Sequence, residues 1–359
     1  MSLTLTVHGE RWRRHLLAVA AENPGLVPVA KGNGYGFTLG RLARKSQWLA
    51  ERGHGVDTLA VGTYDELPEA ATRFPGSLLV LTPWRPFGAA LDLAPELADR
   101  VIHTVSREED LVALLERDPR ARYVLEEVTT MLRHGLTARQ LRAVGARLHA
   151  LGTGRGGRLE GVAFHLPLGQ GGHESEMHRL LTDVVSAGLD TSTIWVSHLT
   201  VAELGRLRAA YPELTFRPRI GTSLWLGDRA ALKVTATVLD VHPVERGDGF
   251  GYRQRSMPKS GHLLVVSGGT AHGIGLAAPT GDQSVRSRAA ALARGGLDAA
   301  GFVRSPFHID GKSRLFAEPP HMQASMLFLP EGPRVPAVGD EIEVRVRFTT
   351  TTFDRIVTV

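Results

Sequence analysis

The stretch VPVAKGNGYGFTLGRLA, residues 27–43, decides the fold prediction because an apolar run ends in a lysine that three glycines follow closely. Residues 26–30 are typical of a short buried strand, and residues 38–53 have the apolar spacing of a helix. Lys31 therefore lies at the carboxyl end of a strand, where α/β sheets and barrels bind ligands. Such a lysine can clamp a phosphate, act as a nucleophile towards an aldehyde, or be solvated in a glycine-rich loop.

The pattern around this stretch predicts two domains. From residue 26 to about 226, short apolar runs alternate with helical stretches, in roughly eight strand–helix units. After Gly227 the pattern changes to β-branched alternation with Gly and Pro turns, as in LKVTATVLDVHPV. We therefore predict an α/β protein with an N-terminal (β/α)8 TIM-type barrel over residues 1–228 and a C-terminal, mostly β domain over residues 229–359.

Composition limits the classes of function. The chain has 359 residues, is 43% hydrophobic and contains no cysteine, which excludes disulfides and thiolate sites. Its net charge of +5 comes from 42 basic residues scattered among 37 acidic ones, which favours solvated helix faces over a nucleic-acid surface. No apolar segment is long enough for export or for a membrane span, so we expect a cytoplasmic protein that binds neither nucleic acid nor membrane.

Further anion-binding positions follow late strands of the predicted barrel. Gly221 and Thr222 in PRIGTS come after the last strand, close to where barrels commonly hold phosphate. Ser197 and Thr200 in VSHLT follow the preceding strand, although a hydroxyl at this point is also the usual helix cap. When the barrel closes, its last strand should lie beside the strand of Lys31.

Motifs along nearly the whole chain resemble those of the alanine racemase family, which are pyridoxal 5'-phosphate (PLP) enzymes with a barrel and a C-terminal β domain. VAKGNGYG resembles the family's lysine motif, which implies that Lys31 bonds the cofactor and that Tyr35 meets its phosphate. TTMLRHGL resembles T-G-M-x-R-x-G and implies a substrate-side role for Arg133. LEGVAFHL is similar to the strand that carries a pocket histidine, here His165.

The later motifs of the family have counterparts in the same order. RIG resembles the segment whose arginine binds the pyridine nitrogen, which implies this role for Arg219 and phosphate contacts for Gly221 and Thr222. GDGFGYR is similar to the segment of the catalytic tyrosine, here Tyr252, and PPHMQ to the segment that brings Met322 to the partner's site. The resemblance implies a homodimer with shared active sites.

The residues around the cofactor suggest the type of reaction. An aspartate beside the pyridine nitrogen would keep that nitrogen protonated and make the ring a strong electron sink. An arginine is always charged and cannot accept that proton, so Arg219 implies a weaker electron sink. Such a site suits removal of a proton from one face of an amino acid and its return on the other. Lys31 and Tyr252 are the two expected bases, and His165 or Arg133 could supply the cationic surroundings that a phenol needs.

Several positions depart from the family pattern. Glu126 stands where many members have a carbamylated lysine that orients the arginine, here Arg133. Met322-Gln323 replaces a Met-Asp pair, and GTAHG places Thr270 where a pocket tyrosine is expected and His272 where an aspartate is expected. These changes predict a substrate-binding wall that differs from that of an alanine-specific enzyme, with Thr270 leaving room for a larger side chain.

Racemisation of an amino acid is therefore the preferred interpretation, with two alternatives. One is decarboxylation or aldol cleavage on the same scaffold, although that class typically has an acid at the pyridine nitrogen and, for decarboxylases, a cysteine in the β domain. The other is a non-catalytic PLP-binding protein, although such proteins often lack the β domain. Metal catalysis is not predicted, because His173 and His178 are five residues apart, a poor chelating spacing on a helix.

Overall fold

The computed structural model describes residues 2–152, 156–168, 172–276 and 303–359. They form two compact units, one of Arg13–Gly227 and the other of the residues up to Trp12 together with Asp228–Val359. The second unit includes strand β1 (Leu3–Val7), which the sequence boundary at residue 228 assigns to the barrel. This difference arises because β1 pairs with β10 (Leu232–Val244) and β18 (Arg355–Thr358), two distant strands of the second unit, which sequence periodicity does not reveal.

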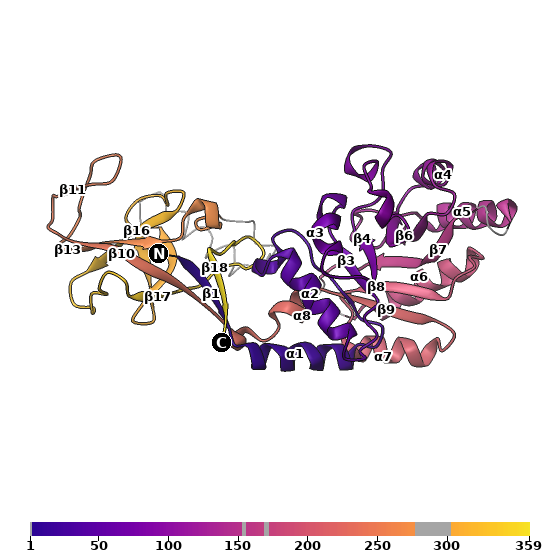
Figure 1. Cartoon of the computed structure of the whole chain (residues 1–359), viewed down its shortest axis with the longest axis horizontal. Helices are drawn as coiled ribbons and strands as arrows, with labels where there is room; N and C mark the ends of the chain where they lie inside the picture. The colour runs from indigo at the N-terminus through magenta and orange to yellow at the C-terminus, as the bar shows by residue number, and fades with distance from the viewer. Residues whose placement is uncertain (1, 153–155, 169–171, 277–302) are drawn as a thin grey trace. The chain divides into compact units, whose positions relative to one another are not determined.

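The first unit is an eight-stranded parallel barrel, as predicted (Figure 1). Its strand order is β2-β9-β8-β7-β6-β5-β4-β3, and a bridge between Val29 and Ala60 joins the two ends. The strands are β2 (Val27–Pro28), β3 (Thr58–Val61), β4 (Ser77–Val80), β5 (Val101–Val105), β6 (Arg122–Glu127), β7 (Arg158–His165), β8 (Thr193–Ser197) and β9 (Thr215–Ile220). Strand β2 is shorter than the predicted run of five, although the N–H groups of Val29 and Ala30 continue the pairing to Ile220 and Ala60.

A layer of buried side chains fills the barrel. This barrel-core layer consists of Val27, Val29, Ala60, Leu79, Ile102, Val124, Ala163 and Trp195. Trp195 is the largest, and Gly161 makes room for it, because a Cβ at Gly161 would lie 2.7 Å from the indole nitrogen. The indole N–H donates to the carbonyl of Glu160 at 2.9 Å. The barrel is therefore a packed core and not a pore.

Amphipathic helices connect the barrel strands. In chain order the helices are α1 (Gly9–Glu22), α2 (Leu39–Ala50), α3 (Leu67–Ala71), α4 (Glu108–Arg117), α5 (Ala138–Leu151), α6 (Glu174–Ser186), α7 (Val201–Ala210) and α8 (Thr222–Leu226). Short 3-10 turns of this unit are η1 (Gly34–Gly36), η2 (Tyr64–Glu66), η3 (Gly88–Ala90) and η4 (Pro95–Leu97), whereas η5 (Arg229–Ala231) and η6 (Thr270–His272) belong to the second unit. Helix α2 buries Leu39, Leu42 and Leu49, the apolar spacing that predicts it.

The second unit is a mostly antiparallel β structure, which confirms the predicted C-terminal β domain. Its strands are β1, β10 (Leu232–Val244), β13 (Gly261–Ser267), β14 (Arg304–Ile309), β15 (Lys312–Phe316), β16 (Ala324–Pro330), β17 (Glu341–Val344) and β18 (Arg355–Thr358). Pairing of β13 with both β16 and β10 closes β10, β13, β16, β15, β14 and β17 into a ring. A separate hairpin consists of β11 (Gly249–Phe250) and β12 (Arg255–Ser256).

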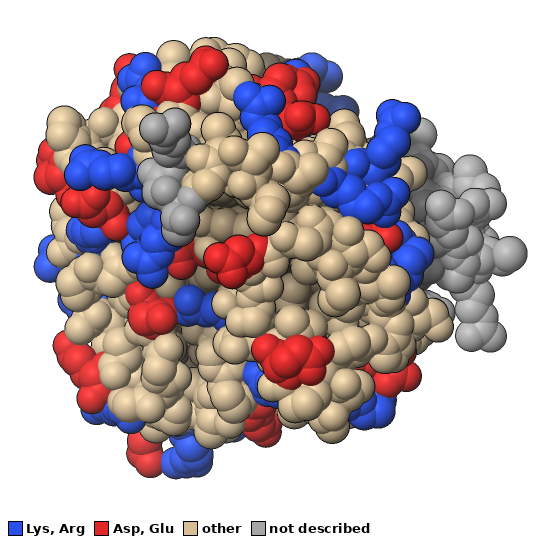
Figure 2. Space-filling view, turned by 90° about the vertical axis from the view of Figure 1, so that its right-hand side faces the viewer, with Lys and Arg blue, Asp and Glu red and all other residues tan. Residues whose placement is uncertain are grey.

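Two surface properties bear on function. No helix among the described residues is long and apolar enough to cross a membrane. On the face that Figure 2 shows, basic and acidic side chains are interspersed on a mostly uncharged surface. This arrangement is typical of solvated charges and differs from the basic patch of a nucleic-acid-binding face.

Candidate active site

Four of the predicted site residues of the barrel occupy positions one layer above its core. Side chains two positions apart on a strand face the same side, so residues that follow the barrel-core layer by two positions share its interior. Lys31 follows Val29 in this way, Glu126 follows Val124, His165 follows Ala163, and Ser197 follows Trp195. Arg219 on β9 is paired in register with Val27 on β2, so the strands of Lys31 and Arg219 are neighbours, as the sequence predicts.

Lys31 begins a loop that Glu66 holds in place. The Glu66 carboxylate accepts the Gly32 N–H at 2.7 Å through Oε1 and the Gly62 N–H at 2.6 Å through Oε2. A Cβ at Gly62 would lie 3.0 Å from the Cβ of Lys31, so glycine leaves the space that the lysine uses. Glu66 therefore links the loops that follow β2 and β3, and the sequence alone did not identify it.

The ammonium of Lys31 is electrostatically disfavoured. The residue as a whole is exposed, but enough protein surrounds its side chain that partial burial lowers the pKa of Lys31. The charges of Arg133 and Arg219 lower this pKa further, and Glu66 acts in the opposite direction. A lowered pKa favours the neutral amine, which is the form that attacks a carbonyl carbon or accepts a proton.

Tyr35, Gly221 and Thr222 form a small polar enclosure, which we call the Tyr35 cradle. Tyr35 is buried and has left-handed backbone angles, with φ 54°. A Cβ at Gly221 would lie 2.1 Å from the Tyr35 hydroxyl oxygen, so only glycine allows this approach. Burial raises the pKa of Tyr35 to about 12, and the charge of Glu66 adds to the rise, whereas a hydrogen bond with the Thr222 side chain opposes it. Tyr35 is thus a neutral hydroxyl that can donate to an anion.

The cradle is fixed to the strand of Lys31. Helix α8 begins at Thr222, directly after Gly221. The indole N–H of Trp225 in this helix donates to the carbonyl of Val29 at 2.7 Å, in a buried hydrogen bond. A movement of α8 would therefore disturb the backbone two residues before Lys31.

Arg219 and Glu126 are buried inside the barrel with unused hydrogen-bonding atoms. Nη2 of Arg219 donates to the carbonyl of Phe164 at 2.8 Å. Among the described residues, Nε of Arg219 and Oε2 of Glu126 have no hydrogen-bond partner. Burial lowers the pKa of Arg219 to about 10, with Glu126 opposing the shift, and burial raises the pKa of Glu126 against the charges of Arg219 and Arg133. A buried N–H without a partner is costly, which indicates that Arg219 is ready for a ligand.

His165 is held as a neutral imidazole. Its Nδ1 shares a hydrogen bond of 2.9 Å with the hydroxyl of Ser197, and its ring meets that of His198 edge to face at 5.1 Å. Burial lowers the pKa of His165 to about 3, and the charges of Arg133 and Arg219 add to this effect. His198, whose backbone has φ 68°, is a member of this end of the barrel that the sequence did not single out.

Arg133 and Thr200 have different surroundings. Arg133 follows β6 in an exposed loop, and its charge acts on Lys31, His165 and Arg219, so it belongs to the same end of the barrel. Thr200 is the N-cap of α7, where its hydroxyl accepts the backbone N–H of Glu203 and also donates to the Glu203 carboxylate at 2.7 Å. This is the capping alternative, and cofactor binding by Thr200 stays a prediction.

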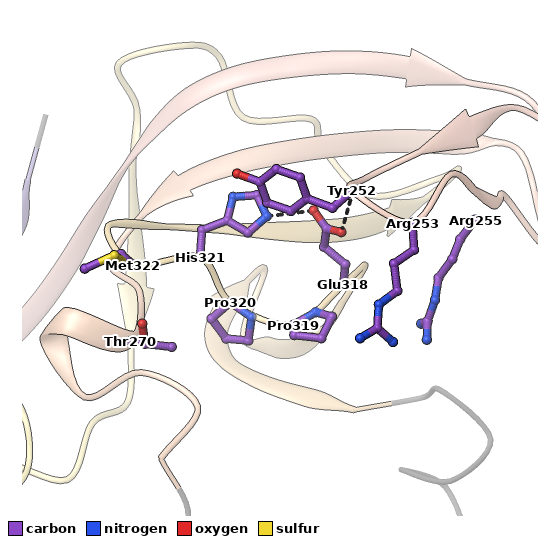
Figure 3. A pocket seen from close by; sticks show the side chains of 9 residues that line it. All are labelled: Tyr252, Arg253, Arg255, Thr270, Glu318, Pro319, Pro320, His321 and Met322. Carbon is purple, nitrogen blue, oxygen red and sulfur yellow. Dashed lines mark hydrogen bonds and ion pairs between the residues drawn. The ribbon is translucent and has the colours of Figure 1, made fainter.

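The second unit carries Tyr252 beside a cavity of about 390 Å³, shown in Figure 3. The cavity is lined by Tyr252, Arg253, Arg255, Thr270, Glu318, Pro319, Pro320, His321 and Met322. Tyr252 is 84% exposed and Met322 is 73% exposed, so both side chains are open to a ligand or a partner. The structure thus brings together the three predicted residues of this unit, Tyr252, Thr270 and Met322.

His272 has a structural position. It is buried, and its Nε2 shares a hydrogen bond of 2.9 Å with Asp354. It is not among the residues that line the Tyr252 cavity, and its position near the substrate stays a prediction. Glu318 and His321, which the sequence did not single out, do line this cavity, and their only signal was the spacing E-P-P-H.

Comparisons with known proteins identify the family and relatives of the same fold. The family model described as alanine racemase, N-terminal domain, matches residues 10–203. A solved alanine racemase from Bartonella henselae with covalently bound pyridoxal phosphate is 15% identical, with a TM-score of 0.72 and 100% of both chains covered. An alanine racemase from D-cycloserine-producing Streptomyces lavendulae is 20% identical, with a TM-score of 0.67, covering 100% of this chain and 97% of that one. No curated protein sequence matches significantly.

The chain, a parallel barrel followed by an antiparallel β unit, shares its fold with these solved structures over nearly their whole length. The family model covers more than half of the chain. The chain belongs to the alanine racemase family, as its motifs predict, and its low identity to the solved members makes it a divergent one.

Proposed function

We propose that this protein is a PLP-dependent amino-acid racemase that interconverts L- and D-amino acids. The observation that carries the proposal is the convergence, at one end of the barrel, of a lysine with a lowered pKa, a buried arginine with an unpaired N–H, and the Tyr35 cradle. These groups fit PLP. Lys31 would hold its aldehyde carbon, Nε of Arg219 its pyridine nitrogen, and Tyr35, Thr222 and the backbone of Gly221 its phosphate. When bound, PLP would delocalise the electron pair left at the substrate Cα.

Arg219 favours racemisation over competing reactions. Its guanidinium donates hydrogen bonds and, with a pKa of about 10, stays charged near neutral pH. It cannot receive a proton from the ring nitrogen, so the ring would be a weaker electron sink. Such a ring supports brief removal of the Cα proton rather than a long-lived carbanion. Glu126 balances part of the buried charge of Arg219. His165, neutral and hydrogen-bonded to Ser197, would pack against the cofactor.

Two bases on opposite faces of Cα are assigned to Lys31 and Tyr252. Each would remove the proton from one enantiomer, and the base on the opposite face would then supply the proton that forms the other enantiomer. Arg133 would bind the substrate carboxylate, and Met322 and Thr270 would contact the substrate beside Tyr252. We infer that Tyr252 and Met322 serve the barrel of a partner subunit in a homodimer, and their exposure of 84% and 73% supports a role at a protein surface.

The test uses the purified protein with PLP. Borohydride reduction and peptide mapping should place a pyridoxyl group on Lys31, and incubation with each L-amino acid in deuterated water should give the D-enantiomer labelled at Cα. Release of CO2 would instead indicate a decarboxylase, aldehyde release an aldolase, and labelling of Lys31 without turnover a PLP-binding protein. A pyridoxyl group on another lysine would contradict the site itself.

A mixing experiment tests the shared site. Lys31→Ala and Tyr252→Phe chains, each inactive alone, should recover part of the activity after subunit exchange, because one of the two hybrid sites then holds both intact residues. Exchanged heterodimers that remain inactive would place both residues in one chain or remove Tyr252 from the reaction.

A further inference from the structure

The hairpin that carries Tyr252 is tied to the rest of its unit by Glu318. Among the described strands, β11 and β12 pair with each other and with no strand of the ring. The Glu318 carboxylate is 7% exposed, and its Oε2 accepts the backbone N–H of Tyr252 at 3.1 Å. Gly251 has φ 68°, and a Cβ there would lie 2.3 Å from the same oxygen. The hairpin is therefore shaped to receive this carboxylate.

The same carboxylate orients His321 against the Tyr252 ring. Oε1 of Glu318 lies 2.7 Å from Nε2 of His321. The centre of the His321 ring is 4.7 Å from that of Tyr252, with 48° between their planes. Figure 3 shows the Glu318 carboxylate joined to the His321 imidazole and to the backbone of Tyr252. Tyr252 is thus held through its backbone by one residue and through its ring by the other.

The local sequence makes this support rigid. Pro319 and Pro320 separate the two residues and fix φ at both intervening positions. The carbonyl of His321 accepts the N–H of Thr270 at 2.8 Å, and its own N–H donates to Ala324 at 2.9 Å. An imidazole fixed in this way restricts the rotamers of a tyrosine that is otherwise 84% exposed.

We propose that Glu318 and His321 are positioning residues for Tyr252, which they hold in the orientation required for proton transfer at Cα. The inference rests on the proposed racemase function. A base displaced by about 1 Å loses much of its rate, so loss of this support should slow the proton transfer assigned to Tyr252 and leave that of Lys31. Glu318 makes the hairpin contact and His321 the ring contact.

The first test needs neither cofactor nor turnover. Hydrogen exchange of the Tyr252 amide should be about tenfold faster in Glu318→Leu than in the wild type, because its acceptor is lost. Glu318→Gln keeps a carbonyl acceptor and should retain most of the protection. His242→Ala is the matched control, since it removes an exposed histidine 3.3 Å from Asp240 in the same unit. Unchanged protection of Tyr252 in Glu318→Leu would overturn the hairpin contact.

The second test separates the two bases. Exchange of the Cα proton in deuterated water is measured from each pure enantiomer, and Tyr252→Phe identifies the enantiomer whose exchange depends on Tyr252. His321→Ala should slow exchange of that enantiomer by about tenfold to a hundredfold and change the other by less than about twofold. In the Tyr252→Phe background, His321→Ala should have no further effect.

The outcomes are distinct for the two proposals. Equal loss for both enantiomers, or additive loss in the double variant, would overturn the positioning role and leave the racemase proposal intact. Absence of exchange in the wild type with every amino acid would overturn both. Circular dichroism and urea unfolding establish that each variant is folded, and His321→Phe, which keeps a ring but loses the hydrogen bond to Glu318, should fall between wild type and His321→Ala.

Discussion

Replacing Gly221 by alanine should open the Tyr35 cradle and weaken cofactor binding. The added Cβ would lie 2.1 Å from the Tyr35 hydroxyl oxygen and 2.9 Å from its Cζ, whereas ordinary contacts are 3.4–4 Å. The tyrosine would have to retreat by about 1 Å from a buried position that also has a left-handed backbone. Overpacking of this kind costs about 1–3 kcal/mol. If the strain acts on the cofactor-binding form, the Kd for PLP should rise by about tenfold to a hundredfold.

The assay is titration of the apoprotein with PLP, followed by the absorbance of the bound cofactor, together with urea unfolding of the apoprotein. Gly205→Ala is the control, because Gly205 lies in helix α7 with nothing within 4 Å of its added Cβ. That variant should gain about 0.5–1 kcal/mol of stability from helix propensity and bind PLP normally. Tyr35→Phe combined with Gly221→Ala removes the nearest clashing atom and should recover part of the lost stability. Equal unfolding and PLP binding in Gly221→Ala and Gly205→Ala would refute the reasoning.

Three further results are expected. Thr200→Ala should cost about 1 kcal/mol of stability through loss of the α7 cap, without changing the affinity for PLP. Thr137→Ala, which removes the same kind of cap from α5, should have the same effect. A selective loss of PLP affinity in Thr200→Ala would contradict a role in capping alone. Burial and the neighbouring Asp183 raise the pKa of Glu127 from 4.5 to about 8, so between these pH values the folded chain binds a proton that the unfolded chain has lost. As the pH rises through this range, urea unfolding should show stability falling by up to about 1.4 kcal/mol per pH unit. The same slope in Glu127→Gln would contradict this. Thr270→Tyr should lower kcat/KM for substrates larger than alanine, by about 0.8 kcal/mol for each methylene excluded from the Tyr252 cavity, and a wild type that already prefers alanine would contradict this.

The barrel and the neighbourhood of its lysine could be predicted because they follow from local rules. Period-two alternation places Lys31 above a packed layer, and parallel strands bring their carboxyl ends to one edge, so Arg219 on the last strand lies beside it. The role of the Thr200 hydroxyl was ambiguous from the sequence, because a threonine that follows a strand and precedes a helix can either cap the helix or bind an anion. Only the backbone shows that the Glu203 N–H is its partner.

The remaining features depend on contacts between distant segments. Glu66 is 34 residues from Gly32, and Glu318 is 66 residues from Tyr252, so no local periodicity relates the members of either pair. His272 is a further example, because its hydrogen-bond partner Asp354 is 82 residues away and the motif GTAHG gives no sign of it. Such pairs depend on loop conformations, which a single sequence does not specify.

Strand β1 has a consequence for the order in which the molecule assembles. It lies between β10 and β18, and the N–H of Leu3 donates to Asp354 across 351 residues. The barrel unit, Arg13–Gly227, lies in the chain between β1 and β10, and its residues are consecutive. During synthesis we expect the barrel to become compact first, because β1 cannot complete its pairing until β18 has left the ribosome. The β unit that carries Tyr252 would then be completed last, so a chain stopped before residue 355 would have Lys31 in place and Tyr252 on an unfinished sheet.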